Sequence, residues 1–128
     1  MRYDTYREKE AKWLKGVVES DEFKAAPVKI VIIHVPPKSS GWHGEAEVAR
    51  LFAPILNQAG VDAMFCGHIH KWRYDEVGCG MSDADFPVIC SPNACRTEVT
   101  ATSDKIIVEV FDADANKLQT LEINCNKL

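Results

Sequence analysis

The sequence lacks the features that mark a membrane-spanning or nucleic-acid-binding chain. Its longest uncharged apolar run, residues 30–37, is far shorter than the roughly 20 residues that cross a bilayer. Lysine and arginine number 15 against 19 acidic residues, which gives a net charge of −4 and no extended basic block. That charge pattern argues against the electrostatic footprint of a nucleic-acid-binding protein. We therefore expect neither a membrane nor a nucleic acid among its partners.

The N-terminus lacks the apolar core of a secretory signal, because charged residues follow Met1 at once. This leaves the location of the protein open between the cytoplasm and the periplasm. Cysteine pairs at metal-binding spacing are missing as well. The five cysteines are an odd number without a C-x-x-C pair, so neither a disulfide framework nor a cysteine-based zinc site is expected.

The composition is that of one globular domain. The chain has 128 residues, of which 46% are hydrophobic and 27% charged, so a second full domain and a disordered chain are both excluded. A helix is expected over residues 6–20, with Thr5 and Glu8 as a capping box. Its apolar face is expected to contain Trp13, Leu14, Val17 and Val18.

A strand, a helix and a second strand follow. Residues 28–34 are apolar on both side-chain faces, which is typical of a central strand buried on both sides. Helical spacing over residues 45–58 predicts a helix that is kinked or interrupted at Pro54. Residues 61–66 form the second apolar strand, which we expect to lie parallel to the first.

The last third of the chain changes to short β segments. We expect strands over residues 88–90, 97–102, 105–111 and 118–123, arranged as an antiparallel meander. Asp112, Asp114 and Asn116 begin like an EF-hand calcium loop. Lys117 and Ile123 replace the glycine and glutamate that such a loop needs, so a β-turn is the better interpretation.

Three of the four histidines follow the predicted parallel strands. His34 ends the first strand, and His68 and His70 come directly after the second. Ligands of open α/β sheets bind at the carboxyl ends of the strands, so the three side chains are expected at one sheet edge. In an extended segment residues i and i+2 point to the same side, and Gly67 would let the backbone turn. This arrangement predicts a metal site.

These residues carry a resemblance to a known family. Gly67, His68, Ile69 and His70, with a preceding strand and His34-x-Pro36 some thirty residues earlier, resemble the C-terminal half of the calcineurin-like metallophosphoesterases, in the purple-acid-phosphatase-like branch. The resemblance spans residues 6–74. It implies an α/β fold, namely the C-terminal half of an αββα sandwich, with a strand-helix-strand unit followed by an antiparallel β meander.

The resemblance also implies a reaction. The family hydrolyses phosphate esters by attack of a hydroxide that bridges two metal ions, which are divalent or trivalent zinc, manganese or iron. His34 and His68 resemble ligands of one ion, and His70 resembles a ligand of the other. His43 resembles the loop histidine that contacts the phosphate or protonates the leaving group, although a solvated loop histidine is an equally good interpretation.

The family's first metal-binding motifs, D-x-H, G-D-x-x-D and G-N-H-[DE], do not occur in these 128 residues. We therefore expect residues 1–128 to be a single partial domain whose N-terminal partner half is absent. By itself the chain is expected to be inactive or weakly active, to bind one metal ion or none, and to self-associate through an exposed sheet face. The alternatives are a self-contained three-histidine zinc protein and a non-catalytic structural or interaction domain.

Overall fold

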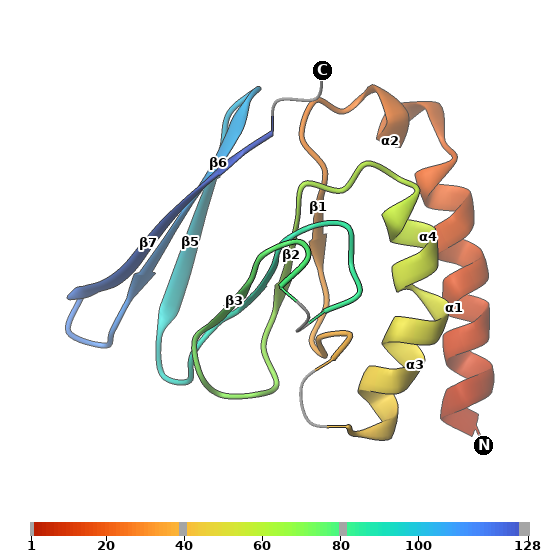
Figure 1. The fold of residues 1–128 in the computed structure, drawn as a ribbon, viewed down its shortest axis with the longest axis horizontal. Helices are drawn as coiled ribbons and strands as arrows, with labels where there is room; N and C mark the ends of the chain where they lie inside the picture. Colours follow the sequence, from red (N-terminus) through yellow and green to blue (C-terminus); the bar gives the residue numbers. More distant parts are fainter. Residues whose placement is uncertain (1, 39–40, 80–81, 126–128) are drawn as a thin grey trace.

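The computed structural model describes residues 2–38, 41–79 and 82–125, which form a layer of helices and two layers of strands (Figure 1). A four-stranded sheet lies between the helices and a three-stranded sheet, an arrangement consistent with part of the predicted sandwich. Within the described part, no helix combines the length and apolar character needed to cross a bilayer. The elements are α1 (Arg2–Val18), α2 (Asp21–Ala25), β1 (Ile30–Ile32), α3 (His43–Leu51), α4 (Ala53–Asn57), β2 (Ala63–Cys66), β3 (Arg73–Asp75), β4 (Val88–Cys90), β5 (Arg96–Ala101), β6 (Lys105–Phe111) and β7 (Lys117–Asn124).

The predicted strand-helix-strand unit is confirmed. β1 and β2 pair in parallel, with Ile30 opposite Ala63, and α3 and α4 connect them. Two hydrogen bonds between Lys29 and Asp62 fix this register. The N–H of Lys29 donates to Oδ2 of Asp62 at 2.8 Å, and the N–H of Asp62 donates to the carbonyl of Lys29 at 2.8 Å.

The prediction of a central strand over residues 28–34 is wrong. The sheet order is β1-β2-β4-β3, so β1 is an edge strand, and only residues 30–32 have strand pairing. Ile32 is 84% exposed. The apolar pattern on both faces indicates burial on both faces, yet no described element covers this residue.

The prediction that residues 88–90 belong to the meander is also wrong. β4 pairs in parallel with β2, and β3 adds antiparallel to β4. All three residues of β4 are buried because the strand is sandwiched inside the molecule. A run of three apolar residues indicates a buried strand but not which neighbour it pairs with.

The rest of the meander is confirmed, since β5, β6 and β7 form a three-stranded antiparallel sheet. The turn between β6 and β7 also has the predicted form. Oδ1 of Asp112 accepts the backbone N–H groups of Asp114 and Asn116, each at 2.9 Å. The Asp112 side chain thus stabilises a turn between the two strands, as the sequence predicts.

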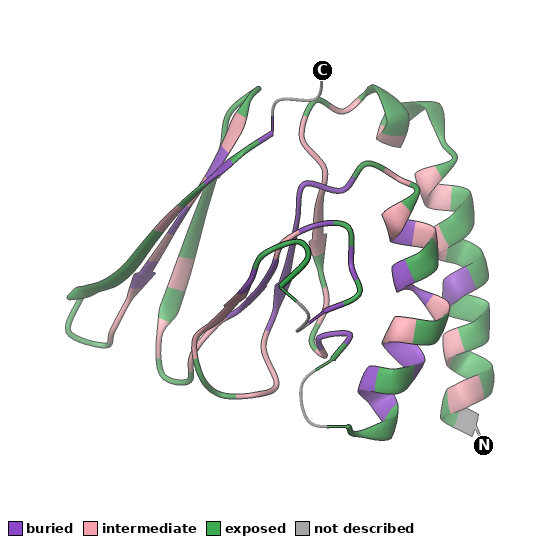
Figure 2. Ribbon diagram, viewed as in Figure 1, coloured by how far each residue is buried: buried purple, intermediate pink, exposed green. Residues whose placement is uncertain are grey.

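Buried residues gather on the helix faces that are turned to the sheet and along the central strands (Figure 2). The first helix begins earlier than predicted, so Thr5 lies inside it and the capping box is wrong. Trp13 is 65% exposed, and Leu14 and Val18 pack against the core instead. The helix predicted over residues 45–58 is interrupted at Phe52, with Pro54 in the first turn of α4, as expected.

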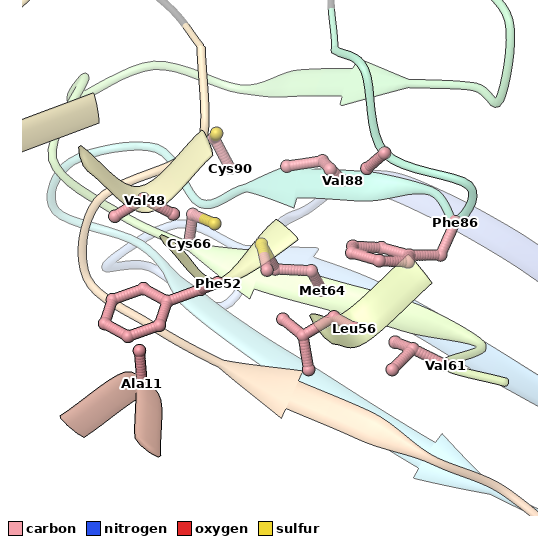
Figure 3. Close-up of a cluster of buried hydrophobic side chains, with 11 residues drawn as sticks. Ala11, Val48, Phe52, Leu56, Val61, Met64, Cys66, Phe86, Val88 and Cys90 are labelled. Atoms are coloured by element: carbon pink, nitrogen blue, oxygen red, sulfur yellow. The ribbon is translucent and has the colours of Figure 1, made fainter. Parts of the chain in front are cut away.

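Two apolar clusters hold the layers together. Figure 3 shows the cluster between helices and sheet, where Phe52 and Leu56 meet Met64. A second cluster lies between the sheets and includes Phe65 and Ile106. All five cysteines are free thiols. The two clusters hold β2 and β4 rigidly in the middle of the molecule and thereby fix the sheet edge described next.

Candidate metal centre

His34 and His68 meet at the carboxyl edge of the four-stranded sheet. Their ring centroids are 5.4 Å apart and the rings are nearly perpendicular, at 82°. Backbone pairing continues past the strand ends and brings them together, since the N–H of Gly67 donates to the carbonyl of His34 at 3.0 Å. The proximity of the two imidazoles is therefore a consequence of two adjacent parallel strands that end at the same edge.

His68 and His70 have left-handed backbone conformations. Their φ angles are +68° and +60°, and the N–H of Ile69 donates to the carbonyl of Gly67 at 2.8 Å. This corrects the expectation of an extended segment that turns at Gly67, because the chain turns at the histidines themselves. A non-glycine residue in this region costs about 1–2 kcal/mol, and such strain concentrates at functional sites.

His70 stands apart from the other two. It is exposed, and its carbonyl accepts the N–H of Asn93 from the loop that follows β4, at 3.3 Å. Within residues 2–38, 41–79 and 82–125, the three histidines do not form a group whose ligand atoms all lie within 4.8 Å of one another. The structure thus joins His34 with His68 and places His70, two residues after His68, outside that ring pair.

Trp42 covers His68. The indole and imidazole rings stack with centroids 4.9 Å apart and an angle of 25° between their planes. Gly44 makes room for the indole, since a Cβ at this position would lie 2.3 Å from Cζ3 of Trp42. The sequence pattern alone does not indicate this role of Gly44.

Glu45 anchors the loop that carries Trp42. Its side chain accepts the backbone N–H of Gly41 at 3.2 Å, and the residue is only 2% exposed. Gly41 has a φ of +84°, a conformation that favours glycine. In the sequence, an acid at this place indicates only a favourable interaction with the N-terminus of a helix, so the anchoring role of Glu45 is seen only in the structure.

His43 contacts helix α1, whereas the resemblance implies that it contacts the phosphate or the leaving group. Its Nε2 lies 3.0 Å from Oδ1 of Asp4 in α1. Asp4, His43 and Glu47 form the one set of three potential metal ligands found within 4.8 Å in the described part of the chain. The hydrogen bond to His43, assisted by Arg7, holds the pKa of Asp4 below its ordinary value.

The residues at the sheet edge fit a metal ion. Neutral imidazole is a common protein ligand for zinc and iron, and His34 and His68 are close enough for one ion to lie between their rings. Trp42 limits the access of water to one face of His68. The donor set is incomplete for two ions, because the described residues supply no carboxylate to this group.

Comparison with known proteins agrees with this chemistry. Residues 1–72 match the family described as calcineurin-like phosphoesterase. The chain is also similar to purple acid phosphatase 18 of Arabidopsis thaliana, with 34% identity over 90 residues. That match covers 67% of this chain and 20% of the relative, so the chain spans about one fifth of the relative's length. Because the family match covers more than half of the sequence, the chain belongs to the calcineurin-like phosphoesterase family.

Proposed function

We propose that this chain is the C-terminal segment of a metal-dependent phosphoesterase that hydrolyses phosphate esters at a two-metal site. The pairing of His34 with His68 at the carboxyl edge of two parallel strands carries this proposal. The strained backbone at His68 and His70 and the family match over residues 1–72 support it. Residues 1–128 would then be one partial domain.

Each histidine has a proposed role. His34 and His68 would hold one ion and His70 would contribute to the second, with zinc, manganese and iron as candidate metals. When bound, the ions would supply Lewis acidity toward the phosphoryl oxygens and would lower the pKa of a water nucleophile. His43 would contact the phosphate or protonate the leaving oxygen. The Trp42 indole would keep His68 in position by stacking.

The remaining ligands would come from an N-terminal half of the same domain. Among the described strands β1 pairs on one side only, so its other edge could receive that half, and both of its faces carry apolar side chains. A groove on one side is lined by Ile30, Ile32 and Val99, and a groove on the other side by Trp13, Val31 and Leu56. The missing half would cover Ile32, and without it two copies of the chain would associate through this edge.

Metal analysis together with hydrolysis of p-nitrophenyl phosphate tests the proposal. We expect two metal ions per longer protein that contains this chain, and a fall in metal content and activity for His68→Ala. Lys71→Ala, an exposed neighbour, should leave both unchanged. The 128-residue chain should show little or no turnover.

Other results would decide for the alternatives. Strong turnover by the 128-residue chain that His70→Ala abolishes would refute the need for a second half. One tightly held zinc per 128-residue chain would favour a self-contained three-histidine site. No bound metal in either protein, under any condition, would favour a structural or interaction domain.

A further inference from the structure

A second group of metal-ligating side chains lies where the first turns of α1 and α3 meet. Asp4 belongs to the first turn of α1, and His43 is the first residue of α3. Glu47 follows His43 by four residues, which places the two side chains on one face of the helix. None of these residues belongs to the pair formed by His34 and His68.

The geometry of this group is close to that of a metal site. The ligand atoms of Asp4, His43 and Glu47 all lie within 4.8 Å of one another. A tetrahedral zinc ion with bonds of about 2.0–2.2 Å holds its donors roughly 3.4 Å apart. The ligand atoms therefore have to move only slightly closer to one another to bind zinc. The His43 side chain is 64% exposed and can rotate to allow this.

We propose that Asp4, His43 and Glu47 form a binding site for a divalent transition metal such as Zn²⁺. One imidazole nitrogen and two carboxylate oxygens are ligands that zinc accepts, and a water molecule completes four-coordination. The bound ion would connect α1 to α3. The site shares His43 with the proposed phosphoesterase function but uses none of the three histidines of the sheet edge, so zinc binding here can be tested without them.

Two arginines already pair with the carboxylates. Nη1 of Arg7 lies 2.9 Å from Oδ1 of Asp4. Arg50 donates to both oxygens of Glu47, from Nε to Oε1 at 3.1 Å and from Nη2 to Oε2 at 2.8 Å. A carboxylate has about four acceptor positions, so each can keep its arginine and still bind a metal. Ligating carboxylates are commonly hydrogen-bonded in this way, which orients them toward the ion. The arginines would also offset the negative charge of the site.

The site limits what His43 can do when metal is bound. The nitrogen that faces Asp4 is Nε2, so this nitrogen would ligate the ion and Nδ1 would carry the proton. An Nδ1–H group can still donate a hydrogen bond to a phosphate oxygen. Proton transfer to a leaving group through Nε2 is excluded while the metal is bound.

Zinc titration calorimetry on the 128-residue chain tests the site. To remove binding at the sheet edge, His34, His68 and His70 are all replaced by alanine. We expect this variant to bind one equivalent of Zn²⁺ and to unfold at a higher temperature when zinc is present. Adding His43→Ala or Glu47→Gln should weaken binding by more than tenfold, because even an outer-shell change costs about 10–100-fold. Glu10→Gln, which removes an exposed acid of α1, is the control and should bind zinc as before.

Two results obtained with the triple-alanine variant overturn the proposal. One is the absence of zinc binding in the triple-alanine variant when its circular dichroism is unchanged. The other is binding that His43→Ala and Glu47→Gln leave unaltered. If the triple variant does not fold, the same test uses Asp4→Asn and Glu47→Gln in the otherwise unchanged chain. Each should then lower the zinc stoichiometry by one, and an unchanged stoichiometry overturns the proposal. A loss of metal on His68→Ala concerns the phosphoesterase proposal alone.

Discussion

The indole of Trp42 stacks on the imidazole of His68 with 4.9 Å between the ring centroids. The contact joins the loop before α3 to the turn after β2, two segments that lie far apart in the sequence. It holds one face of a proposed metal ligand against a large aromatic ring. The stack depends on the missing side chain of Gly44, because any Cβ there would overlap the indole.

Gly44→Ala should therefore separate the two rings. A Cβ only 2.3 Å from Cζ3 of Trp42 cannot be tolerated, and the indole is the more easily moved partner. In proton NMR spectra, the ring-current shift that Trp42 imposes on the His68 ring protons should be lost. Gly16→Ala is the matched control, since nothing lies within 4 Å of its new methyl group. That control should keep the His68 shifts and raise the stability of α1 by about 0.5–1 kcal/mol. Retention of the shifts in Gly44→Ala would contradict the stack.

The sequence predicts the place of His34 and His68 because the rule involved is topological. Two parallel neighbouring strands put their carboxyl ends at one edge, and Asp62 fixes the register by accepting the N–H of Lys29. No comparable topological rule predicts the contact between Asp4 and His43. The two residues are 39 positions apart and meet through the packing of one helix on another. Such contacts leave no periodic signal in the sequence.

The predictions for β1 and for the backbone at His68 are wrong for physical reasons that also lie outside the local sequence. The apolar pattern of β1 correctly indicates side chains suited to burial, but burial of Ile32 needs a neighbour that the described chain does not provide. The left-handed conformation of His68 is against the preference of a residue with a Cβ, so local propensity argues for the wrong backbone. Sites where such local rules fail are expected to be functional or strained.

Ile32→Lys should abolish self-association of the 128-residue chain. A lysine at the end of the edge strand β1 opposes pairing with a second copy by charge repulsion and by desolvation. Sedimentation velocity over a range of concentrations measures the effect. Wild type should form larger species as the concentration rises, and the variant should stay monomeric. Leu118→Lys replaces a 51% exposed leucine on β7 and should leave the association unchanged. A wild-type chain that is monomeric at all concentrations would show that the β1 edge does not associate.

Asp112 should make the stability of the chain depend on acidic pH. Hydrogen bonds from the backbone and side chain of Asn116 lower the pKa of Asp112 from its ordinary value of 3.8. A lowered native pKa gives a contribution that is complete above about pH 4 and is lost as the pH falls through the native pKa. Asp112→Asn should therefore be less stable than wild type at pH 7, and the difference should shrink below about pH 4. Thermal unfolding at several pH values measures this, with Asp114→Asn as the control. A difference that stays constant with pH would contradict the role of the ionised carboxylate.

Asp75→Ala should destabilise the chain far more than removal of an acid from an exposed ion pair. Oδ1 of Asp75 accepts Nε of Arg73 at 2.8 Å, and the two side chains are 3% and 11% exposed. The same guanidinium donates to the carbonyl of Lys38 at 2.7 Å, so it is held in place and its charge would lose its buried carboxylate partner. Removing one partner of a buried pair costs about 3–5 kcal/mol.

Glu98→Ala is the matched control, because Glu98 pairs with Arg96 at the same i, i+2 spacing on a strand but in solvent. The two side chains are 49% and 58% exposed. Its loss should cost less than about 1 kcal/mol, and urea unfolding of both variants measures the two values. Equal costs would mean that burial does not distinguish the two pairs.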